Sequence, residues 1–388
     1  MRSKSLELFD ISFQNSLVDD LKGNSLKLRE LSGEQRRIAI NTIQLYEHLI
    51  ELRAERRTYR GGLHWKKVAG HDYLVRTIDR TGGNRSLGPR SPRTENAYQE
   101  FIETKRDLDE RIRSTTTKVL DQAGYCVAAG VNRVPRIAAN IARSLDTNGL
   151  LGSHLIILGS HAMYAYEMAA GVQLKAGLLQ TEDLDTLLNT KTEIELAGSV
   201  RSSGLLGILQ RVDRTFKPQR KRSFRAVNAK GFMVDLIRAP IDSAGGIALT
   251  SIGGESDLIA EPLRGLEWLT ALPLMTQIVI ADNGLPVKFV VPEPRLFALH
   301  KLWVSLQPTR DPIKRKRDLR QAEAIAQLSL DYFNLSFDDP AIKALPAELT
   351  SMLPGLVERL SERRAKTERE EPALPPGFED PDSDSDEE

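Results

Sequence analysis

Apolar residues recur at helical spacing along several stretches of the chain. Over residues 32–57 they include Ile38, Ile43, Leu45, Leu49 and Leu52, which predicts an amphipathic helix. A segment of small and apolar residues after residue 161, AMYAYEMAAG, predicts a helix that stops at a glycine. Further helices are expected over residues 95–120, 135–145, 202–212, 294–306 and 311–329.

Short apolar or alternating runs predict strands between these helices. The run HLIIL at residues 154–158 is typical of a buried strand, and the alternation of Tyr73, Val75 and Thr77 predicts a short hairpin. Other strands are expected over residues 178–188, 224–227, 232–238, 276–282 and 287–292. Strands mixed with helices in this way indicate an α+β fold with a small mixed sheet.

The pattern divides the chain of 388 residues into five regions. They are a poorly defined N-terminal segment (1–30), a helical region with a basic Gly/Arg-rich segment at 60–95 (31–150), a mixed-sheet core (151–292), a C-terminal helical region (293–366) and an acidic tail expected to be disordered (367–388).

Composition narrows the class of protein. Hydrophobic residues make up 40% and charged residues 28%, which excludes collagen-like and wholly disordered chains. The single cysteine, Cys126, excludes a disulfide framework and a multi-cysteine zinc site and suits a reducing compartment. The most apolar stretch, residues 155–172, is interrupted by polar residues and glycines. We therefore expect a soluble, cytoplasmic protein without a membrane partner.

Charge is distributed unevenly along the chain. The tail from Thr367 onward carries ten acidic residues and one arginine, so that the remaining 366 residues carry a net charge of about +10. A basic body favours a polyanionic ligand such as a nucleotide or nucleic acid. The alternative is that the acidic tail only keeps a basic protein in solution.

Three aspartates are the best candidates for chemistry. Asp183 and Asp185 are two residues apart, so on a strand both carboxylates leave the same face. Asp235 stands in the middle of the apolar strand FMVDLI, where a charge needs a partner. If the two strands are neighbours, the three carboxylates could hold divalent ions, most plausibly magnesium.

The Gly159-Ser160 pair provides a candidate phosphate site. It follows a buried strand and precedes a helix, so backbone amides and the helix N-terminus would both face a bound phosphate.

These motifs together resemble a known superfamily. The order GS, DxD, distant D is similar to that of the polymerase-beta-like nucleotidyltransferases. The flanking segments YRGGLHWKK, SLGPRSPRTE, GSHAMYAYEMAAGV, RVDRTF and PRLFALHKLWVS are similar to bacterial nucleotidyltransferase-fold proteins related to abortive-infection toxins. The resemblance implies a small mixed-sheet nucleotidyltransferase core with helical regions on both sides.

The resemblance also implies roles for the aspartates. Asp183 and Asp185 match the metal pair, and Asp235 matches the third carboxylate, which is expected to help deprotonate the attacking hydroxyl. Two Mg²⁺ ions are expected at these residues. The connection between Ser160 and Asp183 is longer than in compact members of the superfamily.

Phosphate-binding roles are expected at five residues. Gly159-Ser160 matches the phosphate-binding turn of the superfamily, and Lys301 matches a helix position from which a lysine could reach the triphosphate. Arg310 and Lys314 belong to a basic helical segment, residues 310–321, that could contact a nucleotide or nucleic acid.

Each candidate also has a purely structural interpretation. The pair Asp183 and Asp185 could be a solvated strand end, and Asp235 could pair with Arg211 or Arg238. Ser160 could act only as a helix N-cap, and Lys301 could simply extend from an amphipathic helix.

The sequence thus predicts an enzyme that transfers a nucleoside monophosphate from a nucleoside triphosphate to a hydroxyl acceptor and releases pyrophosphate. The acceptor could be RNA, a protein side chain or a small molecule, and the basic segment around Lys66 favours RNA. A toxin or defence factor is a variant of this hypothesis. The alternative class is a non-catalytic nucleic-acid or partner-binding protein that retains the fold. The sequence leaves the oligomeric state open.

Overall fold

The computed structural model describes residues 28–77, 83–179, 181–189, 198–240, 250–254 and 256–370. The chain divides into two compact units. Among the described residues, the larger unit lies within 30–173 and 179–292, and the smaller unit comprises 28–29, 174–178 and 293–370. The two units are described in turn.

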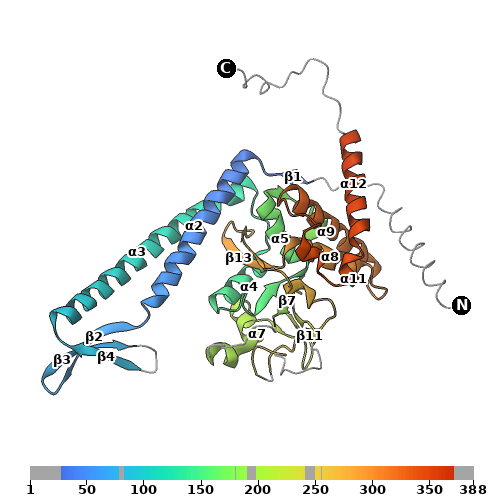
Figure 1. The fold of residues 1–388 in the computed structure, drawn as a ribbon. Coiled ribbons are helices and arrows are strands. Elements are labelled where there is room, and N and C mark those ends of the chain that lie inside the picture. The colour runs from blue at the N-terminus through green and yellow to red at the C-terminus, as the bar shows by residue number, and fades with distance from the viewer. Residues whose placement is uncertain are drawn as a thin grey trace, which may run out of the picture. The chain divides into compact units, whose positions relative to one another are not determined.

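A mixed sheet organises the larger unit (Figure 1). Its order is β5, β7, β10, β9, β8, and β11 pairs with the end of β10. β7 and β11 run parallel to β10, whereas the other neighbours are antiparallel. The strands are β5 (Leu155–Ile157), β7 (Asp183–Leu188), β8 (Lys217–Pro218), β9 (Arg225–Val227), β10 (Met233–Arg238) and β11 (Glu261–Pro262). The expected α+β fold with a mixed sheet is confirmed.

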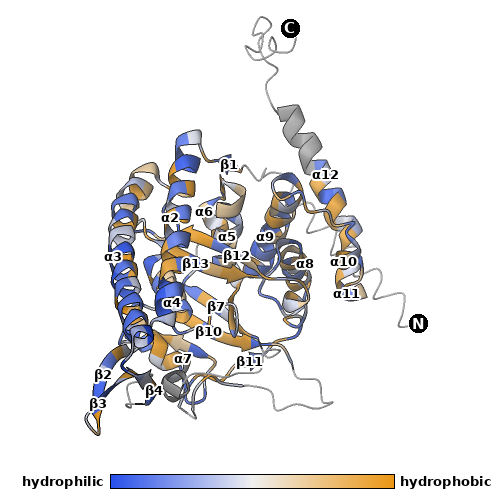
Figure 2. Cartoon of the chain, turned by 60° about the vertical axis from the view of Figure 1, so that its left-hand side comes forward, coloured by the Kyte–Doolittle hydropathy of each residue, from blue (hydrophilic) through white to orange (hydrophobic). Residues whose placement is uncertain are grey.

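The two faces of this sheet differ in burial. One face carries Leu184, Thr186, Val234 and Leu236, all fully buried. The apolar residues of β7 and β10 are the orange segments of these strands in the hydropathy colouring (Figure 2). Because side chains alternate along a strand, the three aspartates of these strands lie on the other face.

Helices and a second hairpin complete the core of the larger unit. They are α4 (Arg136–Thr147), α5 (Gly159–Ala170), α7 (Gly198–Val212) and the antiparallel pair β12 (Met275–Ile280) and β13 (Pro286–Val291). The shorter elements of the chain before residue 293 are β1 (Arg29–Glu30), β6 (Val172–Gln173), the helical turn α6 (Ala176–Leu179) and a 3-10 turn, η1 (Trp268–Thr270).

A long helical hairpin is formed by α2 (Gly33–Thr58) and α3 (Pro92–Ala129). Each helix begins with a serine capping box, at Ser32 and Ser91 respectively. Tyr46, Leu49 and Val119 of these helices form a cluster with Ile278 of β12, which fixes the hairpin to the core.

Between the two helices the chain forms a three-stranded antiparallel sheet, the tip sheet (Figure 1). Its strands are β2 (Gly62–Val68), β3 (His71–Thr77) and β4 (Asn84–Pro89), in that order. The expected short hairpin is therefore part of a larger sheet.

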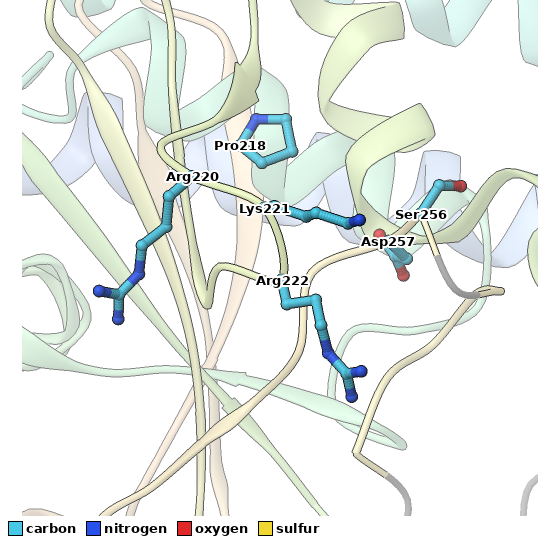
Figure 3. A pocket seen from close by; sticks show the side chains of 6 residues that line it. All are labelled: Pro218, Arg220, Lys221, Arg222, Ser256 and Asp257. Atoms are coloured by element: carbon cyan, nitrogen blue, oxygen red, sulfur yellow. The ribbon is translucent and has the colours of Figure 1, made fainter.

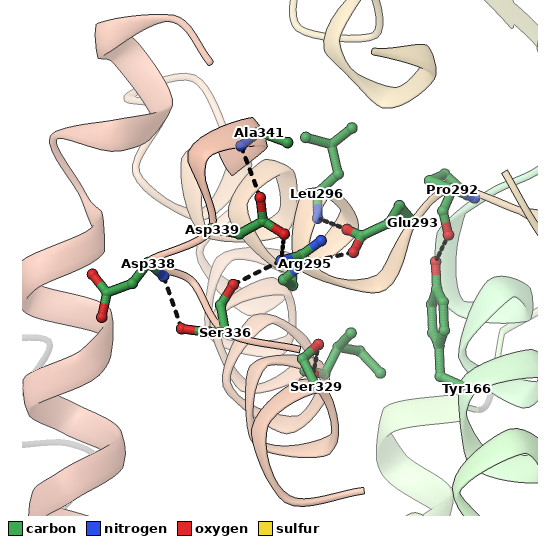
Figure 4. A network of polar contacts seen from close by, with 11 residues as sticks. Tyr166, Pro292, Glu293, Arg295, Leu296, Ser329, Ser336, Asp338, Asp339 and Ala341 are labelled. Atoms are coloured by element: carbon green, nitrogen blue, oxygen red, sulfur yellow. Dashed lines mark hydrogen bonds and ion pairs between the residues drawn. The ribbon is translucent and has the colours of Figure 1, made fainter. Parts of the chain in front are cut away.

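The smaller unit is helical. Its helices are α8 (Pro294–Ser305), α9 (Pro312–Asp331), α10 (Pro340–Lys343), α11 (Ala347–Thr350) and α12 (Leu353–Glu370). A buried arginine, Arg295, ties the start of α8 to a later loop, because it donates to Glu293, to the carbonyl of Ser336 and to Asp339 (Figure 4).

Two expectations about chain segments need correction. The predicted strand over 178–188 begins only at Asp183, because Leu178 and Leu179 belong to the helical turn α6, whose buried leucines pack as a turn. The segment predicted as disordered from residue 367 is helical as far as Glu370, since α12 continues through its charged residues. The acidic tail beyond that point lies outside the described residues.

Candidate active site

The predicted phosphate-binding turn lies at the start of α5. Gly159 follows β5 closely and adopts a left-handed backbone conformation, with φ of +63°. A Cβ at this position would collide with the carboxylate of Asp185, so only glycine fits here. Leu158, the N-cap residue, makes no side-chain capping bond to α5. The first turn of this helix therefore presents its positive end beside Asp185.

The parallel pairing of β7 with β10 brings the three aspartates together. Asp235 is the register partner of Asp185, and Met233 is the partner of Asp183. Neighbouring strands are about 4.8 Å apart, and register partners share a face. Asp183 and Asp185 are half-buried, and Asp235 is 5% exposed. The three aspartates therefore lie on one face of two neighbouring strands.

Arg225 is the partner of Asp235. On β9 it lies directly opposite Asp235, and its Nε and Nη2 atoms donate to the two carboxylate oxygens, each at 2.6 Å. This bidentate hydrogen bond raises the pKa of Arg225, and the charges of Asp183 and Asp185 raise it further. Arg225 thus balances part of the negative charge of the three aspartates.

The expected arginine partners of Asp235 are elsewhere. Arg211 donates to Ser203 and Asn148, and Arg238 donates to the carbonyl of Ala239. The ion pair that the sequence offered as the structural alternative for Asp235 is present, with Arg225 and not Arg211 or Arg238 as the partner.

Side chains behind the aspartates fix the two strands. The hydroxyl of Thr186 donates to the carbonyl of Asp235 at 2.7 Å. Nδ1 of His161 lies 3.1 Å from the carbonyl of Asp183, and Thr181 donates to the carboxylate of Asp183. Burial lowers the pKa of His161 to about 4, so this imidazole is neutral near pH 7 and its Nδ1–H holds β7 against α5.

The donor set suits a hard divalent cation, because all three groups are carboxylates. As the side chains stand, no three His, Cys, Asp or Glu residues of the described chain are grouped to hold a metal ion. Asp183, Asp185 and Asp235 would be the residues to hold such a cation, and Arg225 would have to release Asp235 first, since it engages both oxygens of that carboxylate.

The predicted phosphate-binding cations of the C-terminal region lie in the smaller unit. Lys301 and Arg310 both donate to Asp318, at 2.8 and 2.7 Å, and Asp318 is fully buried. Burial acts to raise the pKa of Asp318, but the two cations outweigh it and hold this pKa below its usual value. Lys314 is exposed in the first turn of α9.

A basic turn joins β8 to β9 immediately before Arg225. Arg220, Lys221 and Arg222 extend from it and line a pocket of about 580 Å³ together with Pro218, Ser256 and Asp257 (Figure 3). The backbone of Arg222 is left-handed, with φ of +56°, a strained conformation for a residue other than glycine. The carboxylate of Asp257 accepts from the amides of Leu205, Leu206 and Gly253.

Comparison with known families identifies the class of protein. A family model described as nucleotidyltransferase matches residues 136–346, more than half of the chain. The chain therefore belongs to this nucleotidyltransferase family, which indicates a transferase whose substrate is a nucleoside triphosphate. No curated protein and no solved structure matches the chain.

The match includes every residue that the sequence singled out for the site, from Gly159 to Lys314. Among the described helices, none is long and apolar enough to cross a membrane. Sequence reasoning missed Arg225 and His161. Arg225 could have been noted as a cation in a predicted strand, but its pairing depends on strand register, which the sequence does not show.

Proposed function

We propose that this protein is a metal-dependent, polymerase-beta-like enzyme that transfers a nucleoside monophosphate from a nucleoside triphosphate to a hydroxyl acceptor. The observation that carries the proposal is the placement of Asp185, which is next to the Gly159 turn on one side and is the register partner of Asp235 on the other. A site for triphosphate and a set of carboxylates therefore share one sheet face.

The roles of the residues follow from this placement. The N-terminal turn of α5 binds the terminal phosphates of the nucleotide. Asp183 and Asp185, joined by Asp235, hold up to two Mg²⁺ ions, which when bound neutralise charge that develops on the phosphate oxygens. Arg225 stabilises the aspartates before the substrate arrives and then releases Asp235.

The reaction breaks one bond and forms one. The hydroxyl oxygen of the acceptor bonds to the α-phosphorus, and the bond from that phosphorus to the oxygen bridging to the β-phosphate breaks. The proton of the hydroxyl passes to the carboxylate of Asp235, and pyrophosphate leaves. Lys301 and Arg310 could contact the triphosphate only if their ion pairs with Asp318 broke. Lys314 makes no such bond to the described residues and is a candidate phosphate contact.

A transfer assay tests this function. The full chain is incubated with Mg²⁺, each of the four α-labelled nucleoside triphosphates, and total RNA, total protein or small-molecule hydroxyl acceptors. We expect label transfer to one acceptor class, and its loss in Asp183→Asn and Asp185→Asn. Asp121→Asn removes an exposed carboxylate from α3 and should retain activity. Equal transfer by wild type and Asp185→Asn would contradict the proposal.

A second candidate function is a binding protein that retains the fold. The bidentate bond from Arg225 to Asp235 favours it, because a chain that never binds metal needs a permanent partner for Asp235. Such a protein would bind nucleic acid in a salt-dependent way that Asp185→Asn leaves unchanged. The enzyme would instead show Mg²⁺-dependent triphosphate affinity that this variant loses.

The cellular role proposed for the enzyme is growth arrest or defence in a bacterial cytoplasm. Overexpression of wild type and of Asp183→Ala tests this role, because a toxic nucleotidyl transfer requires the carboxylate of Asp183. Growth arrest by both forms would separate toxicity from nucleotidyl transfer.

A further inference from the structure

A basic segment borders the aspartates at one edge of the mixed sheet. Residues 214–230, RTFKPQRKRSFRAVNAK, contain seven lysines and arginines and no acidic residue. They include the edge strand β8, the turn from β8 to β9, and β9 itself. Because β9 pairs with β10, which carries Asp235, the positive charge of this segment lies beside the negative charge of the aspartates.

Lys217 of β8 lies on the sheet face of the aspartates. Its register partner on β9 is Val227, whose partner on β10 is Met233. Met233 is in turn the partner of Asp183 on β7. Register partners share a face, so this row crosses four strands on one side of the sheet. Lys217 is exposed and has no ion-pair partner among the described residues, so an uncompensated cation marks the β8 edge of the aspartate face.

The turn between β8 and β9 supplies three more cations. Arg220, Lys221 and Arg222 are exposed, and none of them forms an ion pair with a residue that the structure describes. They line the pocket of about 580 Å³, in which Lys221 extends toward Ser256 (Figure 3). The left-handed backbone of Arg222 costs of order 1–3 kcal/mol, and such strain is concentrated at ligand sites.

The carboxylate in the pocket lining does not neutralise these cations. Asp257 is 6% exposed, and its carboxylate accepts hydrogen bonds from three backbone amides. It also fixes the kink in α7, since a Cβ on the left-handed Gly204 would collide with it. Asp257 is therefore a rigid wall of the pocket, and the cations of the turn remain available to an anionic ligand.

The pocket is close to the aspartates. Arg222 precedes Arg225 by three residues, which span no more than about 11 Å. Arg225 is the register partner of Asp235, and the Cα atoms of such partners are about 5 Å apart. The Cα atoms of Arg222 and Asp235 are therefore at most about 16 Å apart, so one extended ligand can contact both the turn and the aspartates.

We propose that the β8–β9 turn binds the phosphates of a polynucleotide strand, whose terminal hydroxyl is the acceptor; this inference rests on the proposed function. One phosphate group is satisfied by one to three cationic contacts, whereas the cations here extend beyond the pocket to Lys217. Repeated negative charge along a flexible chain matches that arrangement. Arg220 and Arg222 suit it further, because a guanidinium binds phosphate oxygens in pairs. A polynucleotide supplies both this charge and a hydroxyl at its end.

The triphosphate and the strand would approach the aspartates from the two ends of the sheet. In the order β5, β7, β10, β9, β8, the Gly159 turn follows β5 and the basic turn follows β8. The aspartates lie between these turns, on β7 and β10. A small phosphorylated acceptor would occupy the pocket alone and leave Lys217 without a contact. A strand extends from the β8 edge to Asp235, so it is the acceptor that fits this arrangement.

Binding of labelled 12-nucleotide single strands of RNA and of DNA to the full chain, followed by fluorescence anisotropy, tests the proposal. The buffer contains no triphosphate and no metal, so the result does not depend on nucleotidyl transfer. The double variant Arg220→Gln, Lys221→Gln should bind the preferred strand at least about tenfold more weakly. Its slope of log K against log salt should be shallower by about 1.4, because each contact to a single strand contributes about 0.7. The control Arg113→Gln, Lys118→Gln removes two exposed cations from α3 and should bind as wild type does.

The kinetics of transfer connect the turn to the acceptor. With the preferred strand as acceptor, the double variant should raise the KM of the strand at least about tenfold and leave the KM of the triphosphate unchanged. Equal strand affinity in the double variant and the control would overturn the proposal. Transfer to a protein or a small molecule by a wild type that binds neither strand would overturn it as well. Strand binding that requires the turn, without transfer to any acceptor, would support the binding site and contradict the proposed function.

Discussion

Two buried aspartates of this protein, Asp235 and Asp318, each accept hydrogen bonds from cations, but their surroundings differ. Asp318 is enclosed completely, and its negative charge meets two cations, Lys301 and Arg310. Asp235 has one cation, Arg225, and shares its sheet face with two more carboxylates. Asp318 thus meets two cations in a closed site, whereas Asp235 shares its sheet face with two other carboxylates beside the N-terminus of α5.

We therefore expect opposite effects in two clusters: the open cluster of Asp183, Asp185 and Asp235, and the closed cluster of Asp318 with Lys301 and Arg310. Removing a carboxylate from the open cluster relieves repulsion and removes a proposed metal ligand. Removing the carboxylate from the closed cluster leaves buried cations without a partner. Substitutions in the open cluster should therefore change activity, and substitutions in the closed cluster should change stability. The predictions below are ordered from the largest expected effect to the smallest.

The largest effect is expected on activity at the open cluster. Asp185→Asn should lower the rate of nucleotidyl transfer by about 10³-fold or more, equivalent to about 4 kcal/mol, because the proposed function makes this carboxylate a metal ligand. Its urea unfolding midpoint should stay at the wild-type value or rise. A large loss of stability in this variant would show that the open cluster is structural.

The closed cluster should show the reverse. Asp318→Asn should lower the free energy of unfolding by about 3 kcal/mol, because Lys301 would be left buried without its carboxylate. The control Asp338→Asn breaks the exposed pair with Lys343 and should change stability by less than about 1 kcal/mol. Similar midpoints for the two variants in urea would refute the distinction.

Stability should depend on pH through His161 beside the open cluster. Its pKa is lowered from about 6.5 to about 4, so the unfolded chain takes up a proton first as the pH falls. Stability from this group is complete above pH 6.5 and decreases by about 1.4 kcal/mol per pH unit down to about pH 4. Asp318, with a lowered pKa, contributes a loss only below about pH 3.8.

Unfolding in urea at pH 6.5 and pH 5, in metal-free buffer, measures this dependence. Between those values His161 should contribute about 2 kcal/mol, and His161→Gln should remove that part of the change. A variant with the same pH dependence as wild type would show that His161 does not titrate as its burial requires.

The smallest effect is expected from the competition between Arg225 and Mg²⁺ for the carboxylate of Asp235. Arg225→Gln removes the group that engages both oxygens of Asp235, so Mg²⁺ should stabilise this variant at about tenfold lower concentration than wild type. Thermal unfolding at increasing Mg²⁺ concentration measures the shift. An unchanged Mg²⁺ dependence would mean that Arg225 and a cation do not compete.

The sequence predicted the elements of the core because their hydrophobic periods are strong. The strand of Asp235, the helix after Gly159 and the paired helices of the C-terminal region all follow from local patterns. The alternation rule also placed Asp183 and Asp185 on one face, which the β7 strand confirms.

What the sequence could not predict depends on register and on distant partners. Arg225 lies opposite Asp235 only because β9 pairs with β10 in one register. Asp318 on α9 pairs with Lys301 on α8 and with Arg310 in the loop between the two helices, and the sequence does not show that these three residues meet. The short turn α6 has no helical period to detect, and its leucines resembled a strand.

The central claim is that Asp183, Asp185 and Asp235 act together as one cation site, and direct titration of Mn²⁺ into the full chain tests it best. The account predicts that wild type binds Mn²⁺ and that Asp185→Asn and Asp235→Asn each weaken binding by at least about tenfold, whereas Asp121→Asn does not. Binding that is unaffected by Asp235→Asn, or absent from wild type in the presence of a nucleoside triphosphate, would contradict the account.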